Sequence, residues 1–426
     1  MDREKVKRIL IGILPGLIVA GLVFSVGNFV NQNNESKFIN QNTESKIISL
    51  LQSDENNDPW LSGWSKRVKI TIDHNDINED LTDFPVLLHL SASSGINGAD
   101  VTSIFDEVGS NRKKIAVTLA DGVTQCYVEV EKWDAVAKEA WLWVKVPGIS
   151  ATEDTILYIY YDNTQPDNTD YVGDPGETPA QNVWDDNFKL VTHMRDDPDS
   201  SHIRDSTSNG NNGTKKGAGE PMVTSDGKID DAQDFDGTND VVEIPDDDSL
   251  DVTTGITLEA WIKLDVPPSS TTRHFAIVSK EWAYWFYIGV TSDQVYLHIS
   301  GETRDIDVDG TTALEAGKWY HVVGSYRASD GQSRIYVNGV LETDLIREAG
   351  NITTTIYSVK IGTLWSNFLD GVIDEVRISN IARSPAWIKA TYETGRDDLL
   401  YFGTEETLPQ IFLKGGVRLK GGVRLK

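Results

Sequence analysis

The longest apolar stretch of the chain lies close to its N-terminus and predicts a helix that spans a membrane. Residues 9–30 contain no charged side chain. At ~1.5 Å per residue, a helix of that length crosses the roughly 30 Å hydrocarbon core of a bilayer. Four basic residues precede this stretch: Arg3, Lys5, Lys7 and Arg8. The positive-inside rule therefore places the rest of the chain outside the cell.

A cleaved signal peptide is the alternative for residues 1–30. Ser25-Val-Gly27 offers the small residues that a signal peptidase requires, but the apolar run is longer than the roughly 7–15 residues of a signal peptide. We therefore expect a retained single-pass anchor in the cell membrane, with secretion after signal cleavage as the alternative. Under both interpretations the body of the chain is extracellular.

Residues 31–57 are polar and contain a tandem repeat. Asn31-Gln-Asn-Asn-Glu-Ser-Lys-Phe-Ile39 is followed directly by Asn40-Gln-Asn-Thr-Glu-Ser-Lys-Ile-Ile48. Duplicated low-complexity sequence is typical of an extended spacer, so we expect a stalk. A helical oligomerisation segment is the weaker alternative, because the apolar pairs do not recur at a heptad spacing.

From Trp60 onward the pattern changes to short runs of β-branched and aromatic residues separated by Gly, Asn, Asp or Pro, which predicts strands. In the first half these runs are 68–72, 84–90, 125–131, 140–146 and 155–161. We expect a β-sandwich domain over residues 58–172. A linker rich in Gly, Pro and polar residues follows over 173–183.

The alternation within residues 125–131 separates two kinds of side chain. Cys126, Val128 and Val130 fall on one face, and Glu129 and Glu131 fall on the other. Cys126 is therefore expected in the core as a small apolar residue rather than as a nucleophile. As the single cysteine of the chain, it also excludes an intrachain disulfide and a zinc site built from several cysteines.

A longer β region follows over residues 184–405. Its predicted strands are 256–264, 285–290, 295–299, 319–326 and 334–337. Asn338-Gly339 predicts a hairpin, because a type I′ turn requires positive φ at both central residues. Ser384-Pro385 predicts the start of the one clear helix of this region. Strands at this spacing favour a sandwich or a jelly roll, and the exported body is predicted to be all-β.

The net charge of the chain limits the kinds of molecule that it is expected to bind. The chain has 66 acidic and 39 basic residues and a formal net charge of −27. This sign disfavours nucleic acid, because phosphate binding requires a basic footprint. Residues 406–426 form a basic tail in which Lys414-Gly-Gly-Val-Arg-Leu419 repeats as Lys420-Gly-Gly-Val-Arg-Leu425. The tail is expected either to pair as a strand with neighbouring subunits or to remain free.

Several short sequence segments of the second region occur in the same order as in one protein family. They are Gly227-Lys-Ile-Asp-Asp-Ala-Gln-Asp-Phe-Asp-Gly237, Ile256-Thr-Leu-Glu-Ala-Trp-Ile262, Gly317-Lys-Trp-Tyr-His-Val-Val323, Ile335-Tyr-Val-Asn-Gly-Val340 and Gly371-Val-Ile-Asp-Glu-Val-Arg-Ile378. The region resembles a laminin-G-like jelly roll of the concanavalin A-like lectin/glucanase superfamily. Through Trp64-Ser-Lys-Arg-Val-Lys-Ile-Thr-Ile-Asp73 and Leu157-Tyr-Ile-Tyr-Tyr-Asp162, the first region resembles an uncharacterised family found in archaeal and bacterial surface proteins.

The glucanase branch of that superfamily uses paired carboxylates on one strand. The nearest pattern here joins Glu342 and Asp344 with Glu348, and the step from Glu342 to Glu348 is one position longer than that branch usually shows. No Gly-x-Ser-x-Gly, Walker or dinucleotide-binding pattern occurs in the chain. We therefore expect no catalytic residues and no enzymatic activity. A glycoside hydrolase or lyase is the alternative.

A calcium site is the candidate metal chemistry. Asp236 and Asp240 lie on either side of a glycine and offer the hard oxygen ligands that Ca²⁺ prefers. Jelly rolls of the superfamily often hold calcium near this segment, and the resemblance implies that Asp374 approaches it. The hypothesis is a structural Ca²⁺ bound by these three aspartates, and the alternative is that they cap turns.

Residues 281–287 form the densest aromatic stretch. Sugar rings stack their C–H faces on such side chains, so the candidate ligand-binding residues are Trp282, Tyr284, Trp285 and Tyr287. In a strand, Trp282, Tyr284 and Phe286 lie on one face. Trp285 and Tyr287 lie on the other face, and one of the two must be core.

These features predict a membrane-anchored cell-surface protein that recognises an extracellular polysaccharide or matrix polymer and acts in adhesion. The expected partners are a surface glycan, the membrane through the N-terminal helix, and further copies of the chain through the tail. The alternative is a structural subunit of a cell envelope or extracellular filament, in which the tail strand pairs onto neighbours.

Overall fold

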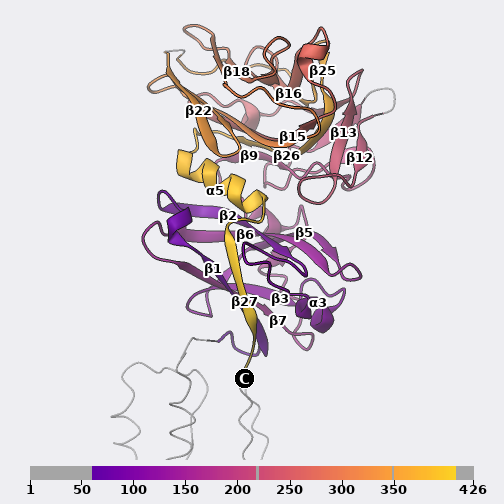
Figure 1. The fold of residues 1–426 in the computed structure, drawn as a ribbon, viewed down its shortest axis with the longest axis vertical. Helices are drawn as coiled ribbons and strands as arrows, with labels where there is room; N and C mark the ends of the chain where they lie inside the picture. The colour runs from indigo at the N-terminus through magenta and orange to yellow at the C-terminus, as the bar shows by residue number, and fades with distance from the viewer. Residues whose placement is uncertain (1–59, 217–219, 348–349, 409–426) are drawn as a thin grey trace, which may run out of the picture. The chain divides into compact units, whose positions relative to one another are not determined.

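The computed structural model describes residues 60–216, 220–347 and 350–408 (Figure 1). The expected anchor or signal segment, the stalk and most of the basic tail lie outside these ranges. Within them, no helix is both long enough and apolar enough to cross a membrane. The described residues belong to one compact unit and are mostly β, as the strand pattern predicts.

Two sheets form what we call the first sandwich. One sheet has the strand order β27-β1-β7-β3-β4 and the other the order β2-β6-β5-β8. Buried side chains of both sheets, such as Ile70 and Leu142, belong to one apolar core. The strands are β1 (Lys66–Ile72), β2 (Leu81–Leu90), β3 (Ile115–Leu119), β4 (Gln125–Cys126), β5 (Val128–Asp134), β6 (Glu139–Ile149), β7 (Thr155–Tyr161), β8 (Val172–Gly173) and β27 (Leu400–Thr407); the short helices are η1 (His74–Asp76), α3 (Ser103–Val108) and α4 (Thr178–Gln181).

The jelly roll also consists of two sheets. The first has the order β10-β11-β14-β23-β16-β17-β18-β19, and the second has the order β12-β13-β26-β15-β20-β21-β22, with β9 paired to β26. The strands of the first sheet are β10 (His202–Ile203), β11 (Gly213–Lys216), β14 (Val241–Ile244), β16 (Phe275–Lys280), β17 (Tyr284–Ile288), β18 (Val295–Ile299), β19 (Ile306–Asp309) and β23 (Val359–Ile361). Those of the second are β9 (Phe188–Thr192), β12 (Met222–Thr224), β13 (Ala232–Asp236), β15 (Gly255–Leu264), β20 (Trp319–Arg327), β21 (Gln332–Val337), β22 (Val340–Ile346) and β26 (Asp370–Ser379). A separate hairpin joins β24 (Thr363–Leu364) to β25 (Asn367–Phe368), and short 3-10 helices lie at η2 (Asp248–Leu250) and η3 (Pro268–Ser270).

Two local predictions about this region are confirmed. Asn338 and Gly339 both have positive φ, of 52° and 73°, and they connect β21 to β22 through the pair Val337 and Val340. The predicted helix is α5 (Pro385–Gly395), and the Ser384 side chain accepts a hydrogen bond from the backbone N–H of Trp387. A few adjacent residues, which form the turn and the helix cap, were therefore enough to predict both elements.

The last strand of the described chain belongs to the first sandwich. The sequence pattern assigns residues 400–405 to the jelly roll, whereas in the structure β27 pairs antiparallel with β1, with Lys66 opposite Thr407 and Ile72 opposite Leu400. Leu400 and Phe402 are buried in the core of the first sandwich. The jelly roll is therefore inserted between β8 and β27.

Helix α5 packs against β2, which explains why that strand is apolar on both faces (Figure 1). The Phe84 and Trp387 rings meet edge to face with centroids 4.8 Å apart. The buried hydroxyl of Thr394 accepts from the backbone N–H of Leu87 at 2.8 Å. One apolar core therefore continues from the first sandwich into α5.

Candidate functional site

Strands β17 and β18 carry pairs of aromatic rings on the face turned away from the jelly-roll core. Trp285 lies opposite His298, and the two rings stack at 4.1 Å between centroids and 15° between planes. Tyr287 lies opposite Tyr296, and these rings stack at 5.2 Å and 11°. The intervening Phe286 points into the core and is fully buried. The strand alternation therefore builds two aromatic layers on one outer face.

Two further tryptophans extend these layers from turns. Trp282 connects β16 to β17, and Trp365 occupies the turn between β24 and β25. The Trp365 ring meets that of Trp285 edge-on at 4.9 Å and lies 6.2 Å from that of Trp282. Trp282 is 55% exposed and Trp365 is 50% exposed. We define the aromatic platform as Trp282, Trp285, Tyr287, Tyr296, His298 and Trp365.

Both turn tryptophans adopt a backbone conformation that side chains normally avoid. The φ angles of Trp282 and Trp365 are 62° and 54°. A left-handed backbone places Cβ close to the following carbonyl and costs roughly 1–2 kcal/mol in a non-glycine residue. Strained backbone positions cluster at functional surfaces, so the two turns are candidates for part of a binding surface.

Polar groups lie at the border of the aromatic platform. The His298 ring contacts Asp307 Oδ1 through Nδ1 at 2.8 Å and Ser300 Oγ through Nε2 at 3.2 Å. The hydrogen bond with His298 lowers the pKa of Asp307, which therefore stays ionised at neutral pH. The same cross-strand row continues through Ser279 of β16 to Lys360 of β23.

The four predicted ligand-binding residues thus divide between surface and core. Trp282, Trp285 and Tyr287 belong to the aromatic platform. Tyr284 does not: its side chain is fully buried, its hydroxyl donates to the Leu250 carbonyl at 3.3 Å, and burial raises its pKa. Its place is fixed by the alternation of β17, which turns Tyr284 and Phe286 inward.

The structure brings Asp236 and Asp240 together but places Asp374 elsewhere. Asp240 Oδ2 accepts from the Asp236 backbone N–H at 3.0 Å. Asp236 pairs with Asp370 of β26, so Asp374 lies four residues, or about 13 Å, farther along that strand. Asp236 Oδ1 accepts from the Thr238 backbone N–H at 2.8 Å, as a turn-capping aspartate does. The three aspartates therefore do not form one ligand set.

A buried cluster that the sequence patterns did not single out lies between the first sandwich and the jelly roll. His193, just after β9, contacts Glu375 Oε1 of β26 at 2.6 Å through Nδ1, and the same nitrogen lies 3.3 Å from Glu131 Oε2 of β5. His193 Nε2 lies 3.4 Å from Glu129 Oε2. All four side chains are buried. We call Glu131, His193 and Glu375 the buried triad.

The surroundings of the buried triad supply hydrogen bonds and one guanidinium group. The Trp143 indole N–H donates to Glu131 Oε2 at 2.6 Å, and that of Trp184 donates to Glu129 Oε2 at 2.7 Å. Arg377 donates to Glu375 Oε2 at 2.6 Å and also contacts Glu259 at 3.3 Å. Its guanidinium lies 4.4 Å from the centroid of the Trp143 ring.

Burial dominates the electrostatics of this cluster. Desolvation raises the pKa of Glu131 to about 8. For His193 desolvation acts in the opposite direction, but the nearby carboxylates of Glu131, Glu375 and Glu129 outweigh it and raise the pKa well above its usual range. The imidazole of His193 is therefore protonated at neutral pH.

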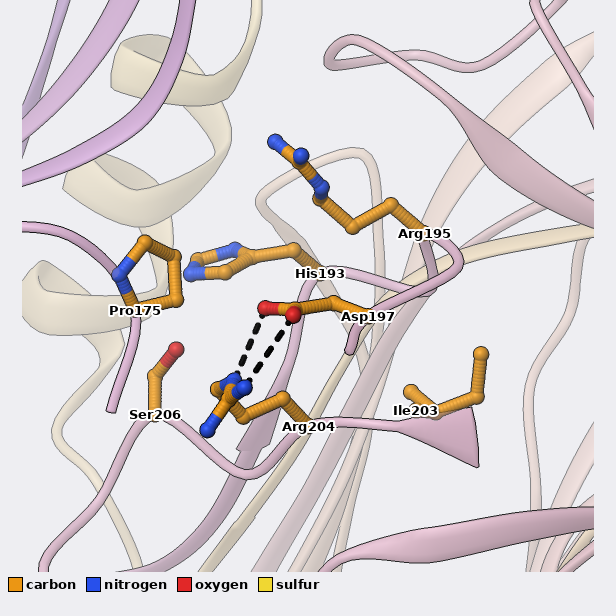
Figure 2. A pocket seen from close by; sticks show the side chains of 7 residues that line it. All are labelled: Pro175, His193, Arg195, Asp197, Ile203, Arg204 and Ser206. Atoms are coloured by element: carbon orange, nitrogen blue, oxygen red, sulfur yellow. Dashed lines mark hydrogen bonds and ion pairs between the residues drawn. The ribbon is translucent and has the colours of Figure 1, made fainter. Parts of the chain in front are cut away.

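A small cavity lies beside His193 (Figure 2). Its volume is about 10 Å³, which is enough for a single water molecule. Arg204 closes one side through two hydrogen bonds to Asp197, at 2.8 and 3.2 Å. The lining residues are Pro175, His193, Arg195, Asp197, Ile203, Arg204 and Ser206.

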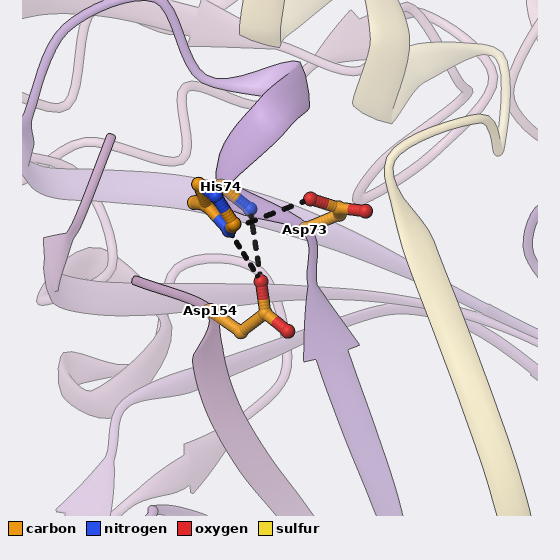
Figure 3. Close-up of side chains that lie close together, drawn as sticks. All are labelled: Asp73, His74 and Asp154. Atoms are coloured by element: carbon orange, nitrogen blue, oxygen red, sulfur yellow. Dashed lines mark hydrogen bonds and ion pairs between the residues drawn. The ribbon is translucent and has the colours of Figure 1, made fainter. Parts of the chain in front are cut away.

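A second group of potential metal ligands lies on the surface of the first sandwich. Figure 3 shows His74 between Asp154 and Asp73, with Nδ1 at 2.8 Å and 3.6 Å from their carboxylates. Asp73 Oδ1 already accepts from the backbone N–H and the side chain of Asn75. The hydrogen bond to Asp154 raises the pKa of His74. Each ligand atom already has a partner, so this group is an exposed ion pair beside a capped 3-10 turn.

Comparisons with protein families agree with the resemblances drawn from the sequence. Residues 236–389 match the family model of the Concanavalin A-like lectin/glucanases superfamily. Residues 111–190 match the model of a domain of unknown function (DUF2341). The jelly roll is thus a concanavalin A-like domain preceded by a domain of the second family, and both resemblances are confirmed. No curated protein matches the chain.

Solved structures with a similar fold include carbohydrate-binding and toxin domains. One is Domain 4 of AbnA, a GH43 extracellular arabinanase from Geobacillus stearothermophilus, in complex with arabinotriose; the match is 24% identical, has a TM-score of 0.38 and covers 47% of this chain and 96% of that one. Another is the binding domain of Paraclostridial Mosquitocidal Protein 1, at 10% identity and a TM-score of 0.41, covering 49% of this chain and 52% of that one. A third is the botulinum neurotoxin serotype D ligand binding domain in complex with N-acetylneuraminic acid, at 14% identity and a TM-score of 0.38, covering 49% and 51%. The chain thus spans about half the length of the two toxin domains, and at these TM-scores the likenesses carry no argument about what it binds.

Proposed function

We propose that the chain is a non-catalytic recognition protein whose jelly roll binds a neutral extracellular polysaccharide on the aromatic platform. The observation that carries this proposal is the group of three tryptophans, Trp282, Trp285 and Trp365, gathered on one outer face from two segments about 80 residues apart in the chain. Flat aromatic faces match the C–H faces of sugar rings, and two of the three indoles are at least half exposed.

The charge around the aromatic platform favours a neutral polymer over an anionic one. Asp307 borders the platform as a carboxylate, and the chain as a whole carries a net charge of −27. A polyanion approaching this face would meet repulsion of the same sign, which a neutral glycan avoids.

Adhesion at a cell surface follows from the same proposal. The apolar segment at residues 9–30 and the repeat over 31–57 would hold the platform away from a membrane. Secretion after cleavage of residues 1–30 would give the same ligand specificity without attachment. Protease added to intact cells distinguishes the two, because only an anchored chain remains with the cells until it is cut.

Binding of the purified chain to a panel of polysaccharides tests the proposal. We expect retardation in gels containing neutral arabinan, mannan or β-glucan, and none in gels containing polygalacturonate. Trp285→Ala and Trp365→Ala should each weaken binding by roughly 3- to 10-fold, because one stacked ring contributes about 0.5–1.5 kcal/mol.

Trp319→Ala is the matched control. Trp319 is a partly exposed tryptophan of β20, on the other sheet of the jelly roll. The Trp319→Ala variant should bind the polysaccharides as strongly as the unaltered chain. Equal retardation of the Trp285 and Trp365 variants and the unaltered chain would refute binding on the aromatic platform.

A structural role in an assembly is supported by a different observation. The edge strand β22 exposes three apolar side chains: Val340 at 64%, Leu341 at 41% and Ile346 at 67%. An exposed apolar edge strand can accept a further strand, and the repeated Val-Arg-Leu-Lys of residues 414–426 alternates as a strand would. Sedimentation of the chain with and without residues 409–426 tests this role, because loss of the tail should abolish self-association.

A hydrolase is the least supported candidate. Glu342 accepts hydrogen bonds from the backbone N–H groups of Thr311 at 2.7 Å and Thr312 at 3.2 Å. Asp344 accepts from Gln332 at 3.0 Å and from Arg334 at 3.1 Å. Both carboxylates thus fix neighbouring segments, and Glu348 lies outside the described residues. Absence of sugar release from any polysaccharide that the chain binds is the expected result.

A further inference from the structure

The buried triad combines chemistry from both sandwiches and is independent of the aromatic platform. Glu131 lies on β5 of the first sandwich, whereas His193 and Glu375 belong to the jelly roll. We propose that these three side chains bind one divalent transition-metal cation of the zinc type, which joins the two sandwiches.

The distances suit such an ion. One ligand atom from each residue lies within 4.8 Å of the others. Ligands around a tetrahedral zinc are separated by roughly 3.4 Å, since each lies about 2.0–2.2 Å from the metal. His193 Nδ1 and Glu131 Oε2 are already 3.3 Å apart, and the 2.6 Å contact between His193 and Glu375 need open by less than about 1 Å.

Two buried polar atoms of the triad have no hydrogen-bond partner among the described residues, although His193 Nε2 lies 3.4 Å from Glu129 Oε2. They are Glu131 Oε1 and His193 Nε2. Both side chains are almost completely buried, at 2% and 3% exposure. A buried carboxylate oxygen without a donor is costly, and a cation bound through Oε1 of Glu131 would remove that cost.

The cluster contains more carboxyl groups than cationic side chains. Four carboxyl groups, those of Glu129, Glu131, Glu259 and Glu375, surround the single guanidinium of Arg377 and the imidazole of His193. This excess of carboxyl groups attracts a divalent cation. Buried charge of one sign is strongly unfavourable in a medium of low polarity.

The surrounding groups orient the ligands as outer-shell residues do in metal sites. Trp143 donates to Glu131, and Arg377 donates to the second oxygen of Glu375, leaving Oε1 directed at His193. Glu375 has φ 51° next to the register shift in the pairing of β26 with β15. A bulge turns a side chain away from its regular strand face, which here directs Glu375 toward the triad.

The donor set identifies the class of ion. One imidazole nitrogen and two carboxylates suit zinc and similar transition metals, whereas Ca²⁺ takes six to eight oxygens. A site with three protein ligands leaves one position for a water molecule.

Metal content is the direct test. The purified full-length chain, after exhaustive dialysis against metal-free buffer, should contain about one zinc, cobalt, manganese or iron ion per chain by elemental analysis. Stripping with 1,10-phenanthroline should lower the melting temperature. Zn²⁺ added back at 100-fold above its dissociation constant should raise it by roughly 3–4 °C.

Variants separate this site from accidental binding. His193→Gln and Glu131→Gln should lose the stoichiometric metal and the zinc-dependent rise in melting temperature. His74→Gln, at the exposed His–Asp group of the first sandwich, is the matched control and should retain both. If the His193 variant does not fold, the metal content of the unaltered chain and its response to the chelator decide the question alone.

Two results would overturn the proposal. One is an unaltered chain that contains no stoichiometric transition metal and melts at the same temperature with and without Zn²⁺. The other is zinc binding that His193→Gln leaves intact and His74→Gln removes. The triad would then be a metal-free ion-pair cluster that packs the two sandwiches together.

Discussion

The backbone strain at Trp365 predicts that a glycine variant at this position is more stable than an alanine variant. Replacing Trp365 by alanine or by glycine removes the same ring contacts with Trp285 and Trp282, so the two variants lose the same packing. They differ only in the Cβ atom. At ordinary positions in strands, glycine is the less stable of the two; at Trp365 we expect the opposite order.

The size of the difference follows from the φ angle of 54°. Alanine retains the left-handed penalty of roughly 1–2 kcal/mol, and glycine does not. Glycine loses about 0.4–1 kcal/mol through the greater freedom of its unfolded chain. The Trp365→Gly variant should therefore be the more stable by about 1 kcal/mol.

Urea unfolding followed by circular dichroism measures this difference, provided that the slope with denaturant stays the same in both variants. Trp285 is the matched control, because it lies in β17 with an ordinary strand backbone. There, the glycine variant should be less stable than the alanine variant by about 0.5–1 kcal/mol. An alanine variant at 365 that equals or exceeds the glycine variant would refute the claim that the turn is strained.

Three further predictions concern the fold. Asp185→Asn should cost about 3 kcal/mol, because it leaves the buried guanidinium of Arg383 without its carboxylate. Burial opposes ionisation of Asp185, but the hydrogen bonds from Arg383 outweigh it and lower its pKa, so this stabilisation is present above about pH 4 and is lost as the pH falls through the lower folded pKa. Melting curves from pH 2 to 7 should show that loss in the unaltered chain and not in the variant. Burial raises the pKa of Cys126 to about 12, so the native chain should not react with a thiol reagent at pH 8, and labelling should begin only on unfolding. Phe402→Ala should cost about 3 kcal/mol and bring Cys126 labelling to lower denaturant concentrations, because both residues belong to one core; unchanged labelling would argue that β27 does not stabilise the first sandwich.

Local patterns predicted much of the fold. Alternation in residues 125–131 places Val128 and Val130 in the core, where the structure has them, and the Asn338-Gly339 turn needs only its own two residues. Such features depend on interactions between near neighbours in the chain, which a sequence displays directly.

Long-range pairing is what the sequence did not reveal. The same alternation puts Glu129 and Glu131 on the opposite face, and nothing nearby indicates that the jelly roll covers that face. The available signal was the run of charged residues inside the apolar strand β26, which includes Glu375 and Arg377. Trp365 joins the aromatic platform across about 80 residues of chain, and only the pairing of strands brings it there.

The insertion of the jelly roll between β8 and β27 has a mechanical consequence. A pull on the jelly roll reaches the first sandwich along two covalent routes, through the segment before β9 and through the segment after α5. The two connections share the tension. They also restrict rotation of the jelly roll, which one connection alone would allow. Because Lys66 lies opposite Thr407, a load applied across these two residues would open the β1–β27 ladder from one end, one hydrogen bond after another. A load carried along β1 would instead shear several of these bonds at once.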